Sequence, residues 1–190
     1  FHARARAYIL GNRQIRTVVI AANWPMYFSC EGGFCATSSA RLDLTDSPND
    51  PARIADISAA MAREIDAYRA AGKTVVLVAP VPRMPWDVPR FMLSRIIQGK
   101  SDIGTGEKRA DHDGRAATAA AFLAREAKLP GVFLVDPAAS LCSTGPAGFC
   151  HAEAGGMPLY FDDNHVNGAG ADPVAHAMLA RLDRVADSQR

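Results

Sequence analysis

Three short, nearly continuous apolar runs stand out along the chain, and each has the length of a strand. They are Thr17–Ala22, Thr74–Ala79 and Val132–Asp136. Runs of β-branched residues without polar interruptions are typical of strands that are buried on both faces of a parallel sheet. The pattern therefore predicts three strands of this kind.

The segments between these runs have the periodicity of helices, and the clearest helix follows Asp50. Asn49 or Asp50 can cap it, Pro51 fits its first turn, and Gly72 is placed to end it. Its apolar residues recur at helical spacing: Ile54, Ile57, Met61, Ile65 and Tyr68. This segment is predicted to be an amphipathic helix with one face in the core.

Two more helices are predicted, from about residue 114 to 128 and from about residue 170 to 185, with a weaker one over Val88–Ile97. Strands that alternate with helices imply right-handed crossovers and a parallel sheet, so the fold class is α/β. No repeat or linker interrupts the pattern, and residues 1–190 are expected to form a single domain. The polar stretch from Gly99 to Gly114 is expected to be a long loop, either an ordinary exposed loop or a lid over a site.

The charge is almost balanced, with 21 Lys and Arg against 20 Asp and Glu and a formal net charge of +1. That balance argues against nucleic acid as a partner, because neutralising phosphates requires a basic surface. No apolar run approaches the roughly 18–20 residues of a transmembrane helix. The N-terminal segment FHARARAYIL lacks a methionine and has too short an apolar part for a secretory signal. The chain is therefore expected to be a piece of a longer protein.

The four cysteines form two close pairs, Cys30 with Cys35 and Cys142 with Cys150, and both intervening loops are rich in glycine. An even number of cysteines in local pairs favours two disulfides and an oxidising compartment. A four-cysteine zinc site is an alternative, although the second pair is spaced more widely than zinc knuckles usually are. Four free thiols are the other alternative.

An aspartate and a histidine three residues apart, Asp162 and His165, lie in the polar stretch LYFDDNHVNGAGA just before the last predicted helix. A histidine that acts as a base needs one nitrogen free and the other held by an acceptor, which a nearby carboxylate supplies. Ligands of parallel sheets bind outside the carboxyl ends of the strands, an edge that this loop can reach. The alternative is that this stretch only forms a turn and caps the helix.

Several stretches together resemble the SGNH hydrolase-like domain that is fused to membrane acyltransferases of family 3. LYFDDNHVNGAGA is similar to the closing motif of that family, which reads tyrosine–x–aspartate–x–x–histidine–leucine–serine–x–x–glycine–alanine. VVIAANWPMY, VLVAPVPRMPWDVPRFM and the cysteine-framed segment from Val135 to Asp163 also fit in order and spacing. Val166 and Asn167 stand where the family usually has leucine and serine. The resemblance implies a flavodoxin-like, three-layer α/β/α domain.

The resemblance also implies site residues. Asp162 orients the imidazole, His165 is the general base, and Asn23, at the end of the first predicted strand, is a candidate for the oxyanion hole. The other interpretation of Asn23 is that it caps the strand end. The nucleophilic serine of the family lies in a glycine–aspartate–serine motif, which this sequence lacks. The serine and the first strands of the sheet are therefore expected to lie upstream of this chain.

Three weaker candidates complete the site. Trp24 could provide an apolar wall for a sugar ring, although an ordinary core position is the alternative. Arg83, after the second predicted strand, could bind an anionic sugar, although a surface arginine is the simpler interpretation. Asp111, His112 and Asp113 could hold a metal, but three adjacent residues rarely converge on one ion, and we expect no metal and no organic cofactor.

The expected function is transfer of an acyl group onto hydroxyls of a bacterial cell-surface polysaccharide at the periplasmic face of the inner membrane. The acyl group is expected to be acetyl. The acyl donor would be delivered by a membrane acyltransferase domain outside this chain. Because the nucleophile is missing, the isolated chain is expected to be inactive. Two alternatives remain: a secreted carbohydrate esterase with the same triad, and a non-catalytic glycan-binding module.

Overall fold

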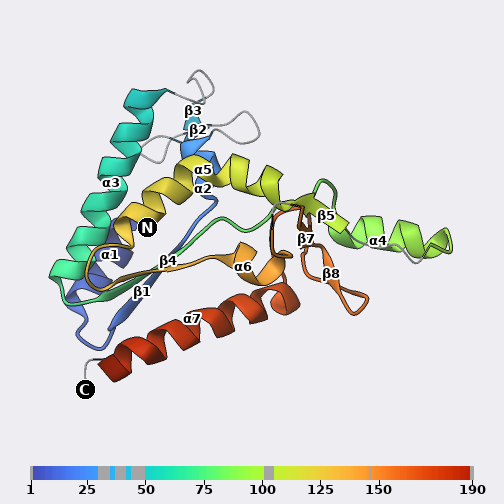
Figure 1. The fold of residues 1–190 in the computed structure, drawn as a ribbon. Coiled ribbons are helices and arrows are strands. Elements are labelled where there is room, and N and C mark those ends of the chain that lie inside the picture. Colours follow the sequence, from blue (N-terminus) through green and yellow to red (C-terminus); the bar gives the residue numbers. More distant parts are fainter. Residues whose placement is uncertain are drawn as a thin grey trace. The chain divides into compact units, whose positions relative to one another are not determined.

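The structure is a computed structural model that describes residues 2–29, 35–36, 42–43, 50–100, 105–145 and 147–188 (Figure 1). Its helices are α1 (His2–Gly11), α2 (Trp24–Phe28), α3 (Pro51–Ala70), α4 (Val88–Ile97), α5 (Arg109–Glu126), α6 (Pro137–Leu141) and α7 (Gly168–Ser188). Its strands are β1 (Thr17–Ala21), β2 (Cys35–Ala36), β3 (Leu42–Asp43), β4 (Thr74–Val78), β5 (Thr105–Lys108), β6 (Val132–Val135), β7 (Phe149–His151), β8 (Glu153–Ala154) and β9 (Met157–Pro158).

The contacts divide the chain into two compact units. The first unit contains Phe1–Ala79 and Thr118–Leu134, and the second contains Pro80–Ala117 and Val135–Arg190. Each unit has its own cluster of buried hydrophobic residues.

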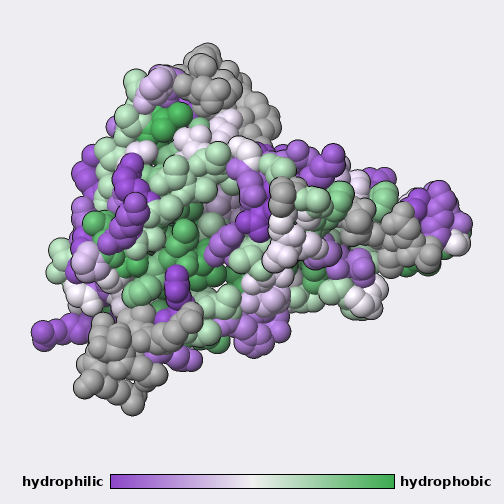
Figure 2. Space-filling model, in the orientation of Figure 1, coloured by the Kyte–Doolittle hydropathy of each residue, from purple (hydrophilic) through white to green (hydrophobic). Residues whose placement is uncertain are grey.

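The first unit is built on a three-stranded parallel sheet in the order β1-β4-β6. β1 pairs in parallel with β4, with Thr17 opposite Thr74 and Ala21 opposite Val78. The three apolar runs are therefore strands, and the predicted α/β fold class with a parallel sheet is confirmed. Hydrophobic residues gather over these strands on the face shown in Figure 2.

Helix α3 supplies much of the core of the first unit, and its two ends are those that the sequence predicts. The carboxylate of Asp50 accepts a hydrogen bond from the N–H of Ala52 at 3.0 Å, and Gly72 adopts φ +72° beyond the last turn. Ile57 and Ile65 are each only 1% exposed. The face predicted from the periodicity is therefore the buried one.

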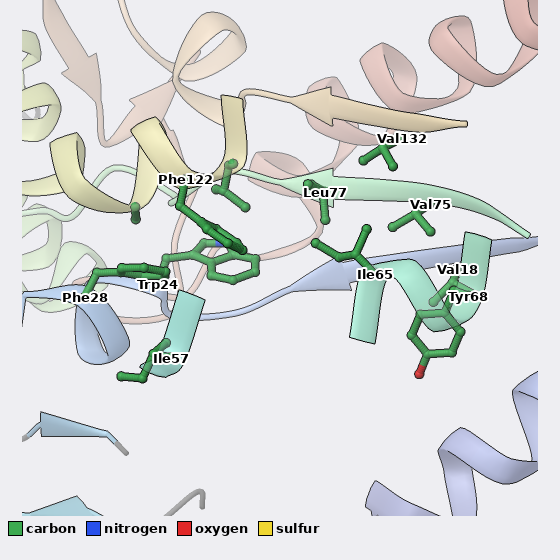
Figure 3. Packing of buried hydrophobic residues seen from close by; sticks show 12 residues of the cluster. Val18, Trp24, Phe28, Ile57, Ile65, Tyr68, Val75, Leu77, Phe122 and Val132 are labelled. Atoms are coloured by element: carbon green, nitrogen blue, oxygen red, sulfur yellow. The ribbon is translucent and has the colours of Figure 1, made fainter. Parts of the chain in front are cut away.

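Aromatic side chains form another part of the core of the first unit (Figure 3). The ring of Phe28 lies 5.3 Å from that of Phe122 and 6.5 Å from that of Trp24. The indole N–H of Trp24 donates to the carbonyl oxygen of Val78 at 2.6 Å. Because this polar atom is satisfied, Trp24 can be fully buried without the cost of an unpaired donor.

The second unit consists of α4, α6, α7, the first part of α5 and two short antiparallel strand pairings. β5 pairs with β7, and β8 pairs with β9 through the turn residues Gly155 and Gly156. Both glycines have positive φ, at 59° and 82°, as a tight two-residue hairpin requires. Its buried cluster contains Met84, Leu141, the half-cystines and Tyr160.

The polar stretch from Gly99 to Gly114 is not one long loop, so this prediction was wrong. Residues 105–108 form β5, and α5 begins at Arg109 rather than near Gly114. The backbone N–H of Arg109 donates to the carbonyl oxygen of Gly148, and its guanidinium donates to that of Ala138. These partners are distant in sequence, so a local pattern cannot reveal them.

Among the residues that the structure describes, no helix combines the length and the hydrophobicity needed to cross a bilayer.

Candidate active site

The polar stretch before α7 forms a tight hairpin with alternating burial. Tyr160 and Val166 form an antiparallel bridge, and the N–H of Phe161 donates to the carbonyl oxygen of His165 at 2.8 Å. Tyr160 is fully buried and Val166 packs against the core of the second unit, whereas Phe161 and His165 are exposed. The hairpin therefore presents His165 to solvent from a backbone that is anchored in the core.

Asp162 organises this hairpin with both carboxylate oxygens. Oδ1 accepts the N–H groups of Asn164 and His165 at 2.9 and 2.8 Å, and Oδ2 lies 2.7 Å from Nδ1 of the His165 ring. Burial on its own raises the pKa of Asp162, but the two backbone N–H groups and the His165 ring outweigh it and lower the pKa to about 2.

An ionised carboxylate can only accept hydrogen bonds, so Nδ1 of His165 must carry the proton that is shared with Oδ2 of Asp162. In the neutral ring, Nε2 is then the free, basic nitrogen. The His165 side chain is 74% exposed, which leaves this nitrogen open to a reactant. The pair therefore has the geometry of a general base that is oriented by its acid.

Asn167 and Gly170 fix the start of α7 directly behind the hairpin. Oδ1 of Asn167 accepts the N–H of Gly170 at 3.1 Å, and its Nδ2 donates to the carbonyl oxygen of Pro158 at 2.7 Å. Asparagine thus caps the helix where the family usually has serine, another good capping residue. Gly170 lies so close to the carbonyl oxygen of Leu159 that a Cβ at this position would clash with it.

The segment before α4 anchors the hairpin from the other side. The N–H of Met84 donates to the carbonyl oxygen of Asp163 at 2.6 Å, and that of Val88 donates to the carbonyl oxygen of Asp162 at 3.1 Å. The guanidinium of Arg83 pairs with the carboxylate of Asp163 at 2.8 and 2.9 Å. In this structure Arg83 therefore helps to hold the loop of the Asp162–His165 pair.

The backbone of Arg83 contacts a buried carboxylate, Glu107, that was not predicted from the sequence. Glu107, 8% exposed, accepts the backbone N–H of Arg83 at 2.6 Å and two hydrogen bonds from Arg115, each of 2.7 Å. Nδ1 of the buried His112 is 3.5 Å from Glu107. Burial favours the protonated acid, but His112, Arg115 and the Arg83 N–H outweigh it and lower the pKa of Glu107. An isolated glutamate before a helix gives no sequence signal for such a network.

The disulfide between Cys142 and Cys150 is confirmed, with an S–S distance of 2.11 Å. Cys150 is fully buried in the second unit. The other predicted disulfide, Cys30 with Cys35, lies outside the residues whose side chains the structure describes.

Removal of the Cys142–Cys150 bridge should destabilise the chain without unfolding it at room temperature. The bridge closes a loop with a sequence separation of 8, for which the loss of loop-closure entropy predicts roughly 2–3 kcal/mol. Urea denaturation of the double variant Cys142→Ala/Cys150→Ala measures this difference. An unchanged midpoint would show that the bridge does not contribute to stability.

Two predicted site residues lie in the first unit. Asn23 is exposed directly after β1, and the structure records no capping hydrogen bond from its side chain, so its role in an oxyanion hole stays a prediction. Trp24 is fully buried in the core described above. It offers no face to a sugar ring, so the prediction that it binds substrate is wrong, and the core interpretation holds.

A serine–histidine contact lies next to the Cys142–Cys150 disulfide. Oγ of Ser143 is 3.0 Å from Nε2 of His151, and both residues are exposed. Among the described residues, no carboxylate forms an ion pair with His151. The described residues also contain no group of three or more metal-ligating side chains, and His112 belongs to the Glu107 network.

With the Asp162–His165 pair, the α/β fold and the closing motif established, comparison with known proteins gives the family. Residues 1–180 match the family described as the SGNH domain fused to AT3 domains, and the chain belongs to this family.

Among solved structures, the chain is similar to the periplasmic domain of the lipopolysaccharide acetyltransferase of Salmonella ser. Paratyphi A. The TM-score is 0.52 at 12% sequence identity, and the match covers 74% of this chain and 54% of that chain. This likeness shows a shared fold, and the chain matches about half the length of that domain. No curated protein matches the sequence.

Proposed function

We propose that this chain is the acyl-transfer domain of an enzyme that O-acetylates a bacterial cell-surface polysaccharide in the periplasm. The observation that carries the proposal is the 2.7 Å contact between Asp162 and an exposed His165, at the positions of the family motif. The fold shared with a periplasmic domain of a lipopolysaccharide acetyltransferase supports it. Residues 1–190 would act as a single domain, and AT3 domains would deliver the acyl donor.

In the proposed reaction, the serine of the family's glycine–aspartate–serine motif attacks the carbonyl carbon of the acyl donor. This motif does not occur among the 190 residues, and in this proposal the serine comes from outside them. Nε2 of His165 takes the serine proton and gives it to the leaving group of the donor. Backbone N–H groups, with Asn23, stabilise the oxyanion.

In the second half of the reaction, Nε2 of His165 removes the proton from a sugar hydroxyl. The sugar oxygen forms the new ester bond while the bond between the acyl group and serine breaks, and the proton returns to the serine. Asp162 holds the ring in one tautomer and stabilises the imidazolium that forms in each half. Arg83 would bind an acidic group of the polysaccharide beside the pair.

The chain of 190 residues, assayed alone, should show no turnover of an aryl acetate above the rate of the variant His165→Ala. The reason is that a positioned base without its nucleophile cannot form the acyl-enzyme. Release of the phenol, followed by absorbance, measures this. Turnover that His165→Ala abolishes would place the nucleophile among the serines of this chain, and the variant Ser143→Ala would then be tested first.

Hydrolysis is the second candidate function, because the exposed ring of His165 is open to water as well as to a sugar. The full-length protein, given acyl donor and polysaccharide, distinguishes the two. Acetyl groups on the polysaccharide in amounts that match donor consumption support transfer. Free acetate as the main product, or loss of acetyl groups from a pre-acetylated polysaccharide, would support an esterase instead.

A further inference from the structure

Helix α4 has two hydrophobic faces, of which one is buried and the other exposed. Val88 and Met92 point into the core of the second unit, with exposures of 0% and 4%. On the outer face, Leu93, Ile96 and Ile97 are 58%, 59% and 77% exposed. Residues three and four apart lie on one side of a helix, so these three form a continuous outer face of α4. Scattered exposed aliphatic residues are ordinary, but a cluster on one face indicates an interaction surface.

Both ends of this helix are fixed. The carboxylate of Asp87 accepts the N–H of Arg90 at 2.9 Å at the start. At the end, Gly99 adopts φ +67°, its N–H donates to the carbonyl oxygen of Ile96, and that of Lys100 donates to the carbonyl oxygen of Arg95. This is a complete capping motif. The outer face is therefore held on an ordered element rather than on a frayed segment.

The charges along α4 are of one sign. The segment from Val88 to Lys100 contains Arg90, Arg95 and Lys100 and no acidic residue, in a chain with 21 basic and 20 acidic side chains. Hydrophobic and hydrophilic residues lie next to one another over this helix in Figure 2. The helix dipole favours cations in the last turn, which accounts for Arg95. It disfavours a cation in the first turn, so the dipole does not explain why an arginine stands at position 90.

The position of Arg90 and Lys100 relative to the outer face of α4 offers an explanation for these cations. Arg90 lies three residues before Leu93 on the helix, Lys100 follows the cap just beyond the last turn, and both are exposed. Two long basic side chains thus border an aliphatic face at its two ends. This arrangement is typical of helices that lie in the boundary between lipid headgroups and acyl chains, where cations reach the phosphates and aliphatic groups reach the chains.

We propose that the outer face of α4 docks on the surface of an anionic phospholipid bilayer. Leu93, Ile96 and Ile97 insert at the boundary of the acyl chains, and Arg90 and Lys100 contact lipid phosphates. A second copy of the chain fits less well, because three side chains provide far less than the about 800 Å² per partner of a stable interface. Leucine is also under-represented among the residues that dominate protein interfaces.

This surface is coupled to the catalytic pair within the second unit. The first turn of α4 donates a backbone hydrogen bond to the Asp162 carbonyl, as described above, so α4 and the hairpin form one hydrogen-bonded piece. A bilayer-bound α4 would hold the ring of His165 at a fixed height above the lipid surface. The inference goes beyond the acyl transfer proposed above and does not depend on it.

Sedimentation with lipid vesicles tests the proposal directly on the chain of 190 residues. Vesicles of phosphatidylcholine are compared with vesicles that also contain phosphatidylglycerol, at low and at high salt. We expect binding to the anionic vesicles at low salt, weaker binding at high salt, and little binding to phosphatidylcholine alone. In the variant Leu93→Ser/Ile96→Ser/Ile97→Ser the partition coefficient should fall roughly tenfold or more.

Matched variants separate the contribution of the basic side chains to vesicle binding from that of the aliphatic side chains. Arg90→Gln/Lys100→Gln should weaken binding and remove most of its salt dependence, whereas Lys128→Gln and Leu179→Ser, at exposed positions elsewhere, should bind like the original chain. His165→Ala should also bind normally, which separates this proposal from the catalytic one. Thermal unfolding confirms that each variant is folded.

Equal binding of the triple serine variant, or no preference for anionic vesicles, would overturn the proposal. A concentration-dependent dimer in analytical ultracentrifugation that the triple serine variant abolishes would also overturn it, in favour of self-association.

Discussion

Replacement of His165 by alanine in the full-length protein should abolish polysaccharide acetylation, with a fall in rate of at least about 10³-fold. The imidazole is the only group proposed to move a proton in both halves of the reaction, so no residual base pathway is expected. Asp162→Asn should lower the rate by roughly 10²–10⁴-fold, because an amide cannot stabilise the imidazolium. Its Oδ1 can still accept the N–H groups of Asn164 and His165, so the hairpin should keep its fold.

A second histidine–aspartate pair in α7 provides the matched control. The side chain of His176 is 74% exposed, as is that of His165, but its Nδ1 lies 3.8 Å from Asp172, beyond hydrogen-bond distance. The variants His176→Ala and Asp172→Asn should acetylate normally. Acetylation by His165→Ala at an unchanged rate would eliminate the catalytic role and favour a glycan-binding module.

Replacement of Glu107 by alanine should lower the free energy of unfolding by roughly 3 kcal/mol. The variant leaves the guanidinium of Arg115 without its bidentate partner and the backbone N–H of Arg83 without its acceptor, in a site where the carboxylate is 8% exposed. Urea denaturation of the isolated chain measures the loss. Asp66→Ala removes a carboxylate that is 60% exposed and paired with Arg69, and should cost at most about 1 kcal/mol.

The contribution of the Glu107 carboxylate to the free energy of unfolding depends on pH, and its sign follows from the direction of the pKa shift. The pKa of Glu107 is lowered from its ordinary value of 4.5, so its ionised form stabilises the folded state above pH 4.5. That contribution disappears as the pH falls through the lowered pKa of the folded state. The difference in stability between the original chain and Glu107→Gln should therefore shrink below pH 4.5. A difference that stays constant on acidification would show that Glu107 contributes through packing and not through its charge.

The elements that the sequence predicts well are those whose signals are local. The three strands are continuous apolar runs, and α3 has an aspartate cap, a proline in its first turn and a glycine beyond its end. The Asp162–His165 pair is also local, because three residues of separation within one hairpin suffice to bring the two side chains together. Its recognition from sequence needed only a motif and a position before a helix.

The features that the sequence does not reveal depend on contacts between distant segments. Glu107 is buried because the backbone of Arg83, 24 residues earlier, and Arg115 converge on it. Trp24 lies at the end of a strand, where a ligand contact is plausible, but a hydrogen bond to Val78, 54 residues away, allows it to be buried. The start of α5 likewise depends on Gly148 and Ala138. None of these partners leaves a periodic signal.

The tautomer of His165 can be read from ¹⁵N chemical shifts of its ring, recorded on the isolated chain at a pH where the ring is neutral. The ionised carboxylate of Asp162, 2.7 Å from Nδ1, should place the proton on Nδ1 and leave Nε2 unprotonated, and Asp162→Asn should weaken this preference. A ring with its proton on Nε2, unaffected by Asp162→Asn, would contradict the assignment of His165 as an oriented general base.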